Sequence, residues 1–81
     1  MFLVYALHSP VFDKIYIGFT SDLNQRLLSH NSLGKKGWTL KYRPWTVVFT
    51  EEFDSKPEAM RREKELKSAK GRQFIRSIIA K

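Results

Sequence analysis

The sequence predicts a small α/β (α+β) protein, a three-stranded, mainly antiparallel sheet flanked by helices in the order ββαβαα. An apolar run rich in β-branched and aromatic residues and a second, alternating run follow each other near the N-terminus, separated by a short breaking segment, and indicate a β-hairpin. A capping box in the second half indicates the start of a helix. The chain has 81 residues, which is enough for one modest core and no second lobe. We therefore expect a single domain, 1–81.

The hairpin is expected from two runs rich in β-branched and aromatic residues, 2–8 and 15–20. Residues 9–13 between them include Pro10, which interrupts a strand. A connection of this length favours an antiparallel pair. Strand alternation then places Tyr16 and Gly18 on one face.

A first helix is expected after the hairpin, with Thr20 or Ser21 as its cap and its end near Asn31. Residues 32–44 combine two glycines, a proline and several basic side chains, and this composition predicts a loop. The run 45–53 that follows is expected to be the third strand.

The second helix is expected to begin at the capping box Ser55-Lys56-Pro57-Glu58, which has a proline in the first turn. We expect this helix to run to about Lys70 and to end at Gly71. The apolar spacing of residues 72–80 predicts a short last helix.

The charge balance favours an anionic partner. The chain has 15 Lys+Arg against 8 Asp+Glu, a formal charge of +7, and such a field attracts nucleic acids. Cysteine is absent, which excludes disulfides and thiolate metal sites. The apolar opening run is too short for a signal or membrane-spanning helix, so we expect a cytoplasmic protein that does not enter the membrane.

Polar residues near the expected apolar faces are the candidate functional groups. On the first helix, Arg26 and His30 fall on the side of Leu23, one turn apart. They are either cleft residues, or a snorkelling arginine and a histidine that stabilises the helix C-terminus. On the second helix, Glu63 falls within the apolar stripe. Such a carboxylate needs a partner, either a structural arginine or a divalent cation.

The second strand supplies a tyrosine followed two residues later by glycine. Gly18 removes a side chain beside Tyr16 and leaves room for something to approach the backbone. Tyr5 in the first strand is either a packing residue or a further member of the site. Two tyrosines, an arginine, a histidine and an inward glutamate together suit phosphodiester cleavage.

These residues resemble the GIY-YIG nuclease superfamily, in particular its single-domain, excinuclease-C-like bacterial branch. The YIG motif is intact from Tyr16 to Gly18, and the first motif is reduced to Val4-Tyr5-Ala6. The segment from Thr20 through Arg26 and His30 is similar to the family's first helix. Many relatives carry a lysine after YIG, where this chain has Phe19, and the late asparagine of some members has no clear counterpart.

The resemblance implies a metal-dependent endonuclease that hydrolyses phosphodiester bonds in DNA, as DNA-repair nucleases do. Glu63 would hold one Mg²⁺ or Mn²⁺, and Arg26 would stabilise the charge of the transition state. Tyr5 or Tyr16 would help to deprotonate the attacking water, with His30 as a second candidate. The implied catalytic residues are Tyr5, Tyr16, Arg26, His30 and Glu63.

Two basic clusters could bind the nucleic-acid backbone without taking part in the chemistry. The loop cluster comprises Lys35, Lys36, Lys41 and Arg43, and the junction cluster comprises Lys67, Lys70 and Arg72. The loop cluster follows the helix that carries Arg26, and we expect it to be the principal DNA contact. The alternative for both clusters is a solvated surface.

An alternative function is a basic nucleic-acid-binding accessory module without catalysis. Trp38, Tyr42 and Trp45 alternate with basic residues and could stack on bases, although Trp45 also suits the core of the third strand. A protein-interaction domain would leave the inward Glu63 unexplained and ranks last. Specificity would come from a targeting partner protein, or cleavage would be loosely specific.

Overall fold

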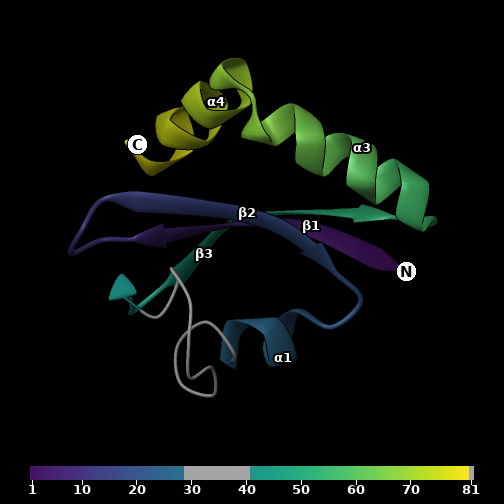
Figure 1. The fold of residues 1–81 in the computed structure, drawn as a ribbon, viewed down its shortest axis with the longest axis horizontal. Helices are drawn as coiled ribbons and strands as arrows, with labels where there is room; N and C mark the ends of the chain where they lie inside the picture. The colour runs from purple at the N-terminus through teal and green to yellow at the C-terminus, as the bar shows by residue number, and fades with distance from the viewer. Residues whose placement is uncertain (29–40, 81) are drawn as a thin grey trace.

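The computed structural model describes residues 1–28 and 41–80. Its elements are β1 (Phe2–Ser9), β2 (Lys14–Thr20), α1 (Leu23–Leu28), β3 (Thr46–Phe53), α3 (Lys56–Lys67) and α4 (Ala69–Ile79). The strands form one antiparallel sheet in the order β2-β1-β3 (Figure 1). The predicted fold class and the order ββαβαα are confirmed.

The hairpin formed by β1 and β2 brings the two predicted tyrosine motifs together. In its register Tyr5 lies opposite Gly18, and Leu7 lies opposite Tyr16. The chain turns back at Asp13, which has a φ of 53° and whose amide donates to the carbonyl of Ser9 at 2.7 Å. Aspartate tolerates this left-handed conformation better than most residues do.

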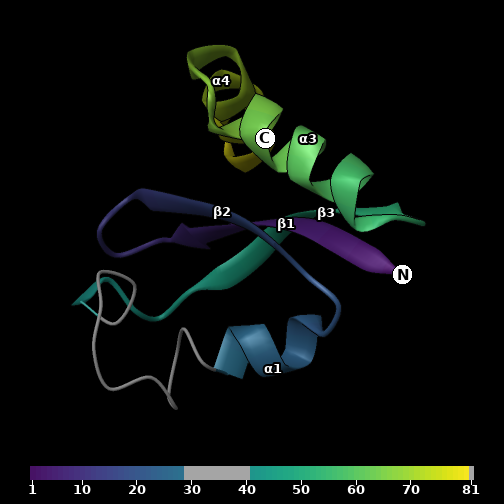
Figure 2. The same ribbon diagram turned by 45° about the vertical axis from the view of Figure 1, so that its right-hand side comes forward.

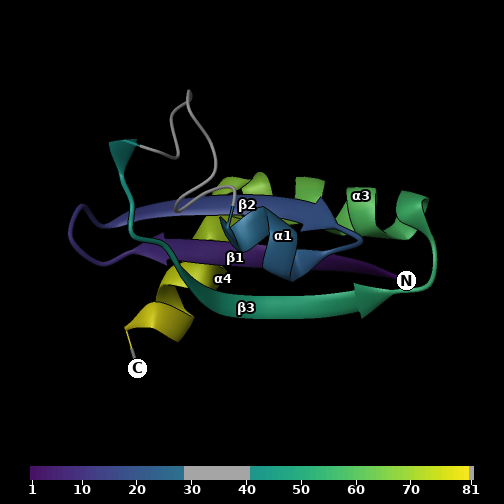
Figure 3. The same ribbon diagram turned by 90° about the horizontal axis from the view of Figure 1, so that it is seen from below.

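The sheet carries helices on both faces. Helices α3 and α4 cover one face and α1 lies against the other (Figures 1 and 2). Figure 3 looks onto the α1 face and shows β2, β1 and β3 side by side. The described residues contain no helix that is long and apolar enough to cross a bilayer.

Each face has its own apolar core. On the α3/α4 face, buried strand residues such as Val4 and Ile17 pack with Leu66 and Ile75 of the helices. On the α1 face, the buried core is Tyr5, Leu7 and Trp45, against which Tyr16, Tyr42, Leu23 and Leu27 pack. The alternation predicted for the second strand is therefore confirmed.

The start of α1 differs from the prediction. The side chain of Asp22, rather than that of Thr20 or Ser21, accepts a hydrogen bond from the Gln25 amide at 3.1 Å. Thr20 instead accepts from the Asp22 amide at 3.0 Å, which fixes the turn that leads into the helix. The predicted end near Asn31 lies outside the described residues, as does most of the predicted loop.

The capping box at the start of α3 is confirmed. The Ser55 hydroxyl accepts from the Glu58 amide at 3.4 Å and donates to the Glu58 carboxylate at 2.9 Å. The predicted end of this helix at Gly71 is wrong. The helix ends at Lys67, and Ser68 is both its C-cap and the N-cap of α4.

Gly71 lies inside α4 and serves close packing instead of termination. A Cβ at this position would meet the backbone of Leu66 and the carbonyl oxygen of Glu65. The Ser68 hydroxyl accepts from the Gly71 amide at 3.2 Å. The prediction took Gly71 for a glycine that ends a helix, whereas it is required by the contact between α3 and α4. A helix C-terminus and a close helix-helix contact both favour glycine near a helix boundary, so the sequence does not distinguish them.

Candidate functional site

A cavity of about 380 Å³ collects most of the predicted catalytic side chains. Both strands of the hairpin, the turn before α1, α1 itself and α3 contribute to its walls. Its lining residues are Phe2, Tyr5, Tyr16, Gly18, Phe19, Thr20, Ser21, Arg26, Lys56 and Glu63. Four of the five predicted catalytic residues, Tyr5, Tyr16, Arg26 and Glu63, therefore line one cavity. The fifth, His30, lies outside the described residues.

Gly18 lines the cavity and also makes room for the two tyrosines, a role that the sequence did not indicate. A Cβ on Gly18 would lie 2.8 Å from the Tyr5 hydroxyl and 3.1 Å from a ring carbon of Tyr16. The Tyr5 and Tyr16 ring centroids are 6.2 Å apart. The missing side chain thus lets the Tyr5 ring lie across the opposite strand and bring its hydroxyl to the cavity wall.

The two tyrosines occupy different environments. Tyr5 is only 2% exposed, whereas Tyr16 is half-buried. Burial raises the pKa of Tyr5 well above its ordinary value, and proximity to Tyr16 and a hydrogen bond with its side chain raise it further. The positive charge of Arg26 acts in the opposite direction, and the charge of Glu63 adds to the rise. Tyr5 therefore remains protonated at neutral pH.

Glu63 extends from α3 with a side chain that is 21% exposed. Its carboxylate forms an ion pair with Lys67, one turn further along the helix, with 3.5 Å between the carboxylate oxygen and Nζ. The sequence left a structural arginine open as the partner of Glu63. The neighbouring Arg62 does not fill this role, because it pairs with Glu51 of β3 at 2.8 Å. Glu63 is thus a carboxylate at a cavity wall, and among the described residues its ion-pair partner is an exposed lysine.

The described residues contain no group of three or more histidine, cysteine, aspartate or glutamate side chains placed to hold a metal ion. A magnesium ion needs only one or two protein carboxylates when water and a substrate phosphate complete its shell. Glu63 and the open cavity beside it fit such a site.

Lys56 is a cavity residue that sequence reasoning missed. It is the first residue of α3 and is exposed. A cation at a helix N-terminus is unfavourable with respect to the helix dipole. That mismatch was a readable signal that Lys56 has a role other than helix stability.

The loop cluster is described only in part. Lys35 and Lys36 lie outside the described residues, and Lys41 and Arg43 are exposed. Lys41 Nζ lies 5.6 Å from the centre of the Tyr42 ring. Trp45, which was considered for base stacking, is instead buried in the core, as the alternative interpretation predicted. Trp38, the other tryptophan considered, lies outside the described residues.

The junction cluster does not form one surface. Lys67 and Arg72 line a second cavity beside β2, whereas Lys70 lines a separate cavity with Arg62 and Phe74. The three residues are close in sequence, but α3 ends and α4 begins at Ser68 between them, and their side chains line different cavities.

Comparison with known proteins agrees with this geometry. The family model described as the GIY-YIG catalytic domain matches residues 1–76. A UPF0213 protein from Staphylococcus haemolyticus is 36% identical over 66 residues, which cover 82% of this chain and 80% of that protein. A UPF0213 protein from Streptococcus pyogenes is 42% identical over 67 residues, covering 82% and 72%.

A solved structure is also similar. The solution NMR structure of the UPF0213 protein BH0048 from Bacillus halodurans superimposes with a TM-score of 0.56 at 30% sequence identity. The match covers 96% of this chain and 85% of that one. With its fold, its intact YIG strand and a family model that spans nearly all of its length, the chain belongs to the GIY-YIG catalytic domain family.

Proposed function

We propose that this protein is a divalent-metal-dependent endonuclease that hydrolyses phosphodiester bonds in DNA. The observation that carries the proposal is the convergence of Tyr5, Tyr16, Arg26 and Glu63 on one cavity, from two strands and two helices. Membership of a catalytic-domain family supports it. The formal charge of +7 supports an anionic polymer as the substrate.

Each side chain has a role that its surroundings suit. Arg26 stabilises negative charge that develops on the phosphate, because a guanidinium offers several donors in a fixed fork. Glu63 would hold one Mg²⁺ or Mn²⁺, which would polarise the phosphate and acidify water. Lys56, which shares the cavity, adds a further positive charge near the substrate.

Of the two tyrosines, Tyr16 is the better candidate to contact the attacking water. It is the more exposed of the two, and its oxygen is within hydrogen-bonding reach of Tyr5. Tyr5 remains protonated because its pKa is raised, so it acts as a fixed donor that orients Tyr16. His30 keeps its proposed role as a second group near the water.

The proposal extends to the biological setting. The resemblance of the sequence to excinuclease-C-like nucleases supports a role in DNA repair in the cytoplasm. A targeting partner protein would supply the specificity that a small catalytic domain lacks.

The test is cleavage of single- and double-stranded DNA with Mg²⁺ or Mn²⁺ by the wild-type protein and by Glu63→Gln. We expect the substitution to lower cleavage by at least about a hundredfold, because it removes the metal-binding charge. Glu65→Gln is the matched control, since Glu65 lies on the same helix but outside the cavity. Equal cleavage by the wild-type protein and Glu63→Gln would show a contaminating nuclease and contradict the proposal.

A non-catalytic nucleic-acid-binding module is the second candidate. Phe19 stands where many relatives carry a lysine, and its ring packs against the core of the α3/α4 face. Tight DNA binding without turnover under any divalent ion would favour this alternative. Loss of cleavage in Glu63→Gln with unchanged binding would reject it.

A further inference from the structure

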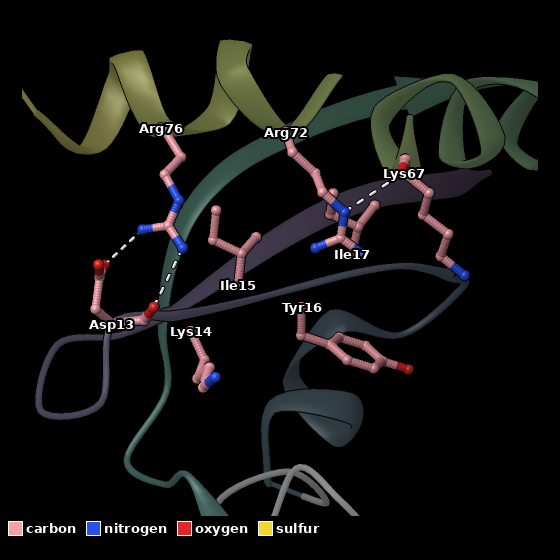
Figure 4. Close-up of a pocket in the computed structure, with 8 residues that line it drawn as sticks. All are labelled: Asp13, Lys14, Ile15, Tyr16, Ile17, Lys67, Arg72 and Arg76. Carbon is pink, nitrogen blue, oxygen red and sulfur yellow. Dashed lines mark hydrogen bonds and ion pairs between the residues drawn. The ribbon is translucent and has the colours of Figure 1, made fainter. Parts of the chain in front are cut away.

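A second cavity, of about 420 Å³, lies along the outer edge of β2. It is lined by Asp13, Lys14, Ile15, Tyr16, Ile17, Lys67, Arg72 and Arg76 (Figure 4). Consecutive strand residues point to opposite faces of a sheet. A cavity that is lined by four consecutive residues of β2, and by Asp13 of the turn before it, therefore follows the edge of the strand. This edge is free within the described sheet, because β2 is its outermost strand.

The charge of this cavity is strongly positive. Lys14, Lys67, Arg72 and Arg76 face one carboxylate, that of Asp13. Arg76 donates to that carboxylate at 2.6 Å and to the Asp13 carbonyl at 3.2 Å. Asp13 therefore neutralises Arg76, and Lys67 pairs with Glu63 of the neighbouring cavity. Lys14 and Arg72 remain as the excess positive charge.

Arg72 is the cation best prepared to receive an anion. Its Nε donates to the carbonyl of Lys67 at 3.3 Å, which holds the side chain in place. Figure 4 shows its guanidinium reaching from α4 toward Ile17, between Arg76 and Lys67. No carboxylate in the described part of the chain forms an ion pair with it. A guanidinium that is held in place matches a phosphate in geometry and charge.

Two contacts join this cavity to the candidate active site. Tyr16 lines both cavities, and the ion pair between Lys67 and Glu63 connects their walls at 3.5 Å. A strand of nucleic acid whose phosphate lay between Arg26 and Glu63 would therefore continue past Tyr16 directly into the second cavity.

We infer that the second cavity is a phosphate subsite for the same nucleic-acid strand, next to the scissile phosphate, with Arg72 as its principal contact. The inference rests on the proposed function and specifies how the substrate lies. The sugar-phosphate backbone of the nucleic acid then follows the edge of β2 and lies between β2 and α4. The junction cluster therefore contributes through Lys67 and Arg72 but not through Lys70.

The first test measures binding of a fluorescent oligonucleotide by anisotropy in EDTA, where no metal-dependent cleavage occurs. Arg72→Ala should weaken binding about tenfold and reduce the salt slope by about one. Lys70→Ala is the matched control, because it removes a cation of the same helix that lies outside the cavity. Arg72→Lys keeps the charge and should restore most of the salt slope. Thermal melting of each variant confirms that it is folded.

The second test separates this inference from the proposed function. Bis(p-nitrophenyl) phosphate has one phosphodiester and no neighbouring phosphate, so Arg72→Ala should lower its hydrolysis much less than it lowers the cleavage of an oligonucleotide. Cleavage of an oligonucleotide by the same variant should fall about tenfold in kcat/KM. Equal affinity and equal salt slope for wild-type and Arg72→Ala proteins would overturn the subsite, whether or not the protein cleaves DNA. Weaker binding by Arg72→Ala without cleavage by the wild-type protein would support the subsite and contradict the nuclease.

Discussion

At the scale of single residues, the YIG segment shows how one strand serves three purposes. Ile17 turns into the core of the α3/α4 face, and Tyr16 turns to the opposite face and the candidate site. Gly18 allows Tyr5 to lie across from the neighbouring strand. Strand alternation was enough to predict which residues share a face. The purpose of Gly18 was not predictable, because it depends on the residue that the hairpin register places opposite.

The two tyrosines make a direct comparison possible. We expect Tyr16→Phe to lower kcat by about 10²–10⁴, the usual contribution of a group that moves a proton. Tyr5→Phe should lower it less, because Tyr5 is a buried donor whose raised pKa keeps its proton in place. Metal-dependent cleavage rates at saturating DNA check both variants. A larger loss in Tyr5→Phe than in Tyr16→Phe would reverse the roles proposed for them.

At the scale of elements, helix periodicity predicted which way a side chain points, but it did not predict which residue of another element that side chain contacts. Glu63 faces the candidate site, as its position in the apolar stripe of α3 indicated. Arg62, however, pairs with Glu51 of β3 at 2.8 Å, a contact between elements that helical spacing cannot reveal. The boundary between α3 and α4 was misplaced for a similar reason, since the role of Gly71 arises from packing against Leu66.

The junction between α3 and α4 gives a prediction about stability. Gly71→Ala should destabilise the protein by about 1–3 kcal/mol, because the added methyl group would overlap backbone atoms of Leu66 and Glu65 that cannot rotate away. Denaturant unfolding measures the loss. Ala69→Gly is a useful control, because it changes helix propensity in the first turn of the same helix without adding a clash. A Gly71→Ala protein as stable as the wild type would mean that the two helices separate at little cost.

At the scale of the whole molecule, an ion pair joins the first hairpin turn to the last helix. Arg76 in the last helix donates to Asp13 in the hairpin turn, and His8 Nε2 lies 3.0 Å from the same carboxylate. Asp13 and Arg76 both line the second cavity, so this ion pair forms part of its wall. The sequence predicted the turn and the helix separately. Their meeting could not be predicted, because 63 positions separate the two residues.

This tie between turn and helix predicts a dependence of stability on pH. Hydrogen bonds from His8 and Arg76 hold the pKa of Asp13 below its ordinary value. A carboxylate with a lowered folded-state pKa contributes stability above its unfolded pKa, about 4, and that contribution is lost as the pH falls through the folded pKa. The melting temperature of the wild-type protein should therefore fall below about pH 4, partly from this group.

Asp13→Asn isolates the effect, because asparagine also tolerates the positive φ of this position but carries no charge. The variant should melt below the wild type at pH 7, and the difference should shrink as the pH falls below about 4. Glu52→Gln removes an exposed carboxylate of β3 and serves as the control for net charge. A difference between wild-type and Asp13→Asn proteins that stayed constant from pH 7 to pH 2 would show that the charge of Asp13 does not stabilise the contact between the hairpin and α4.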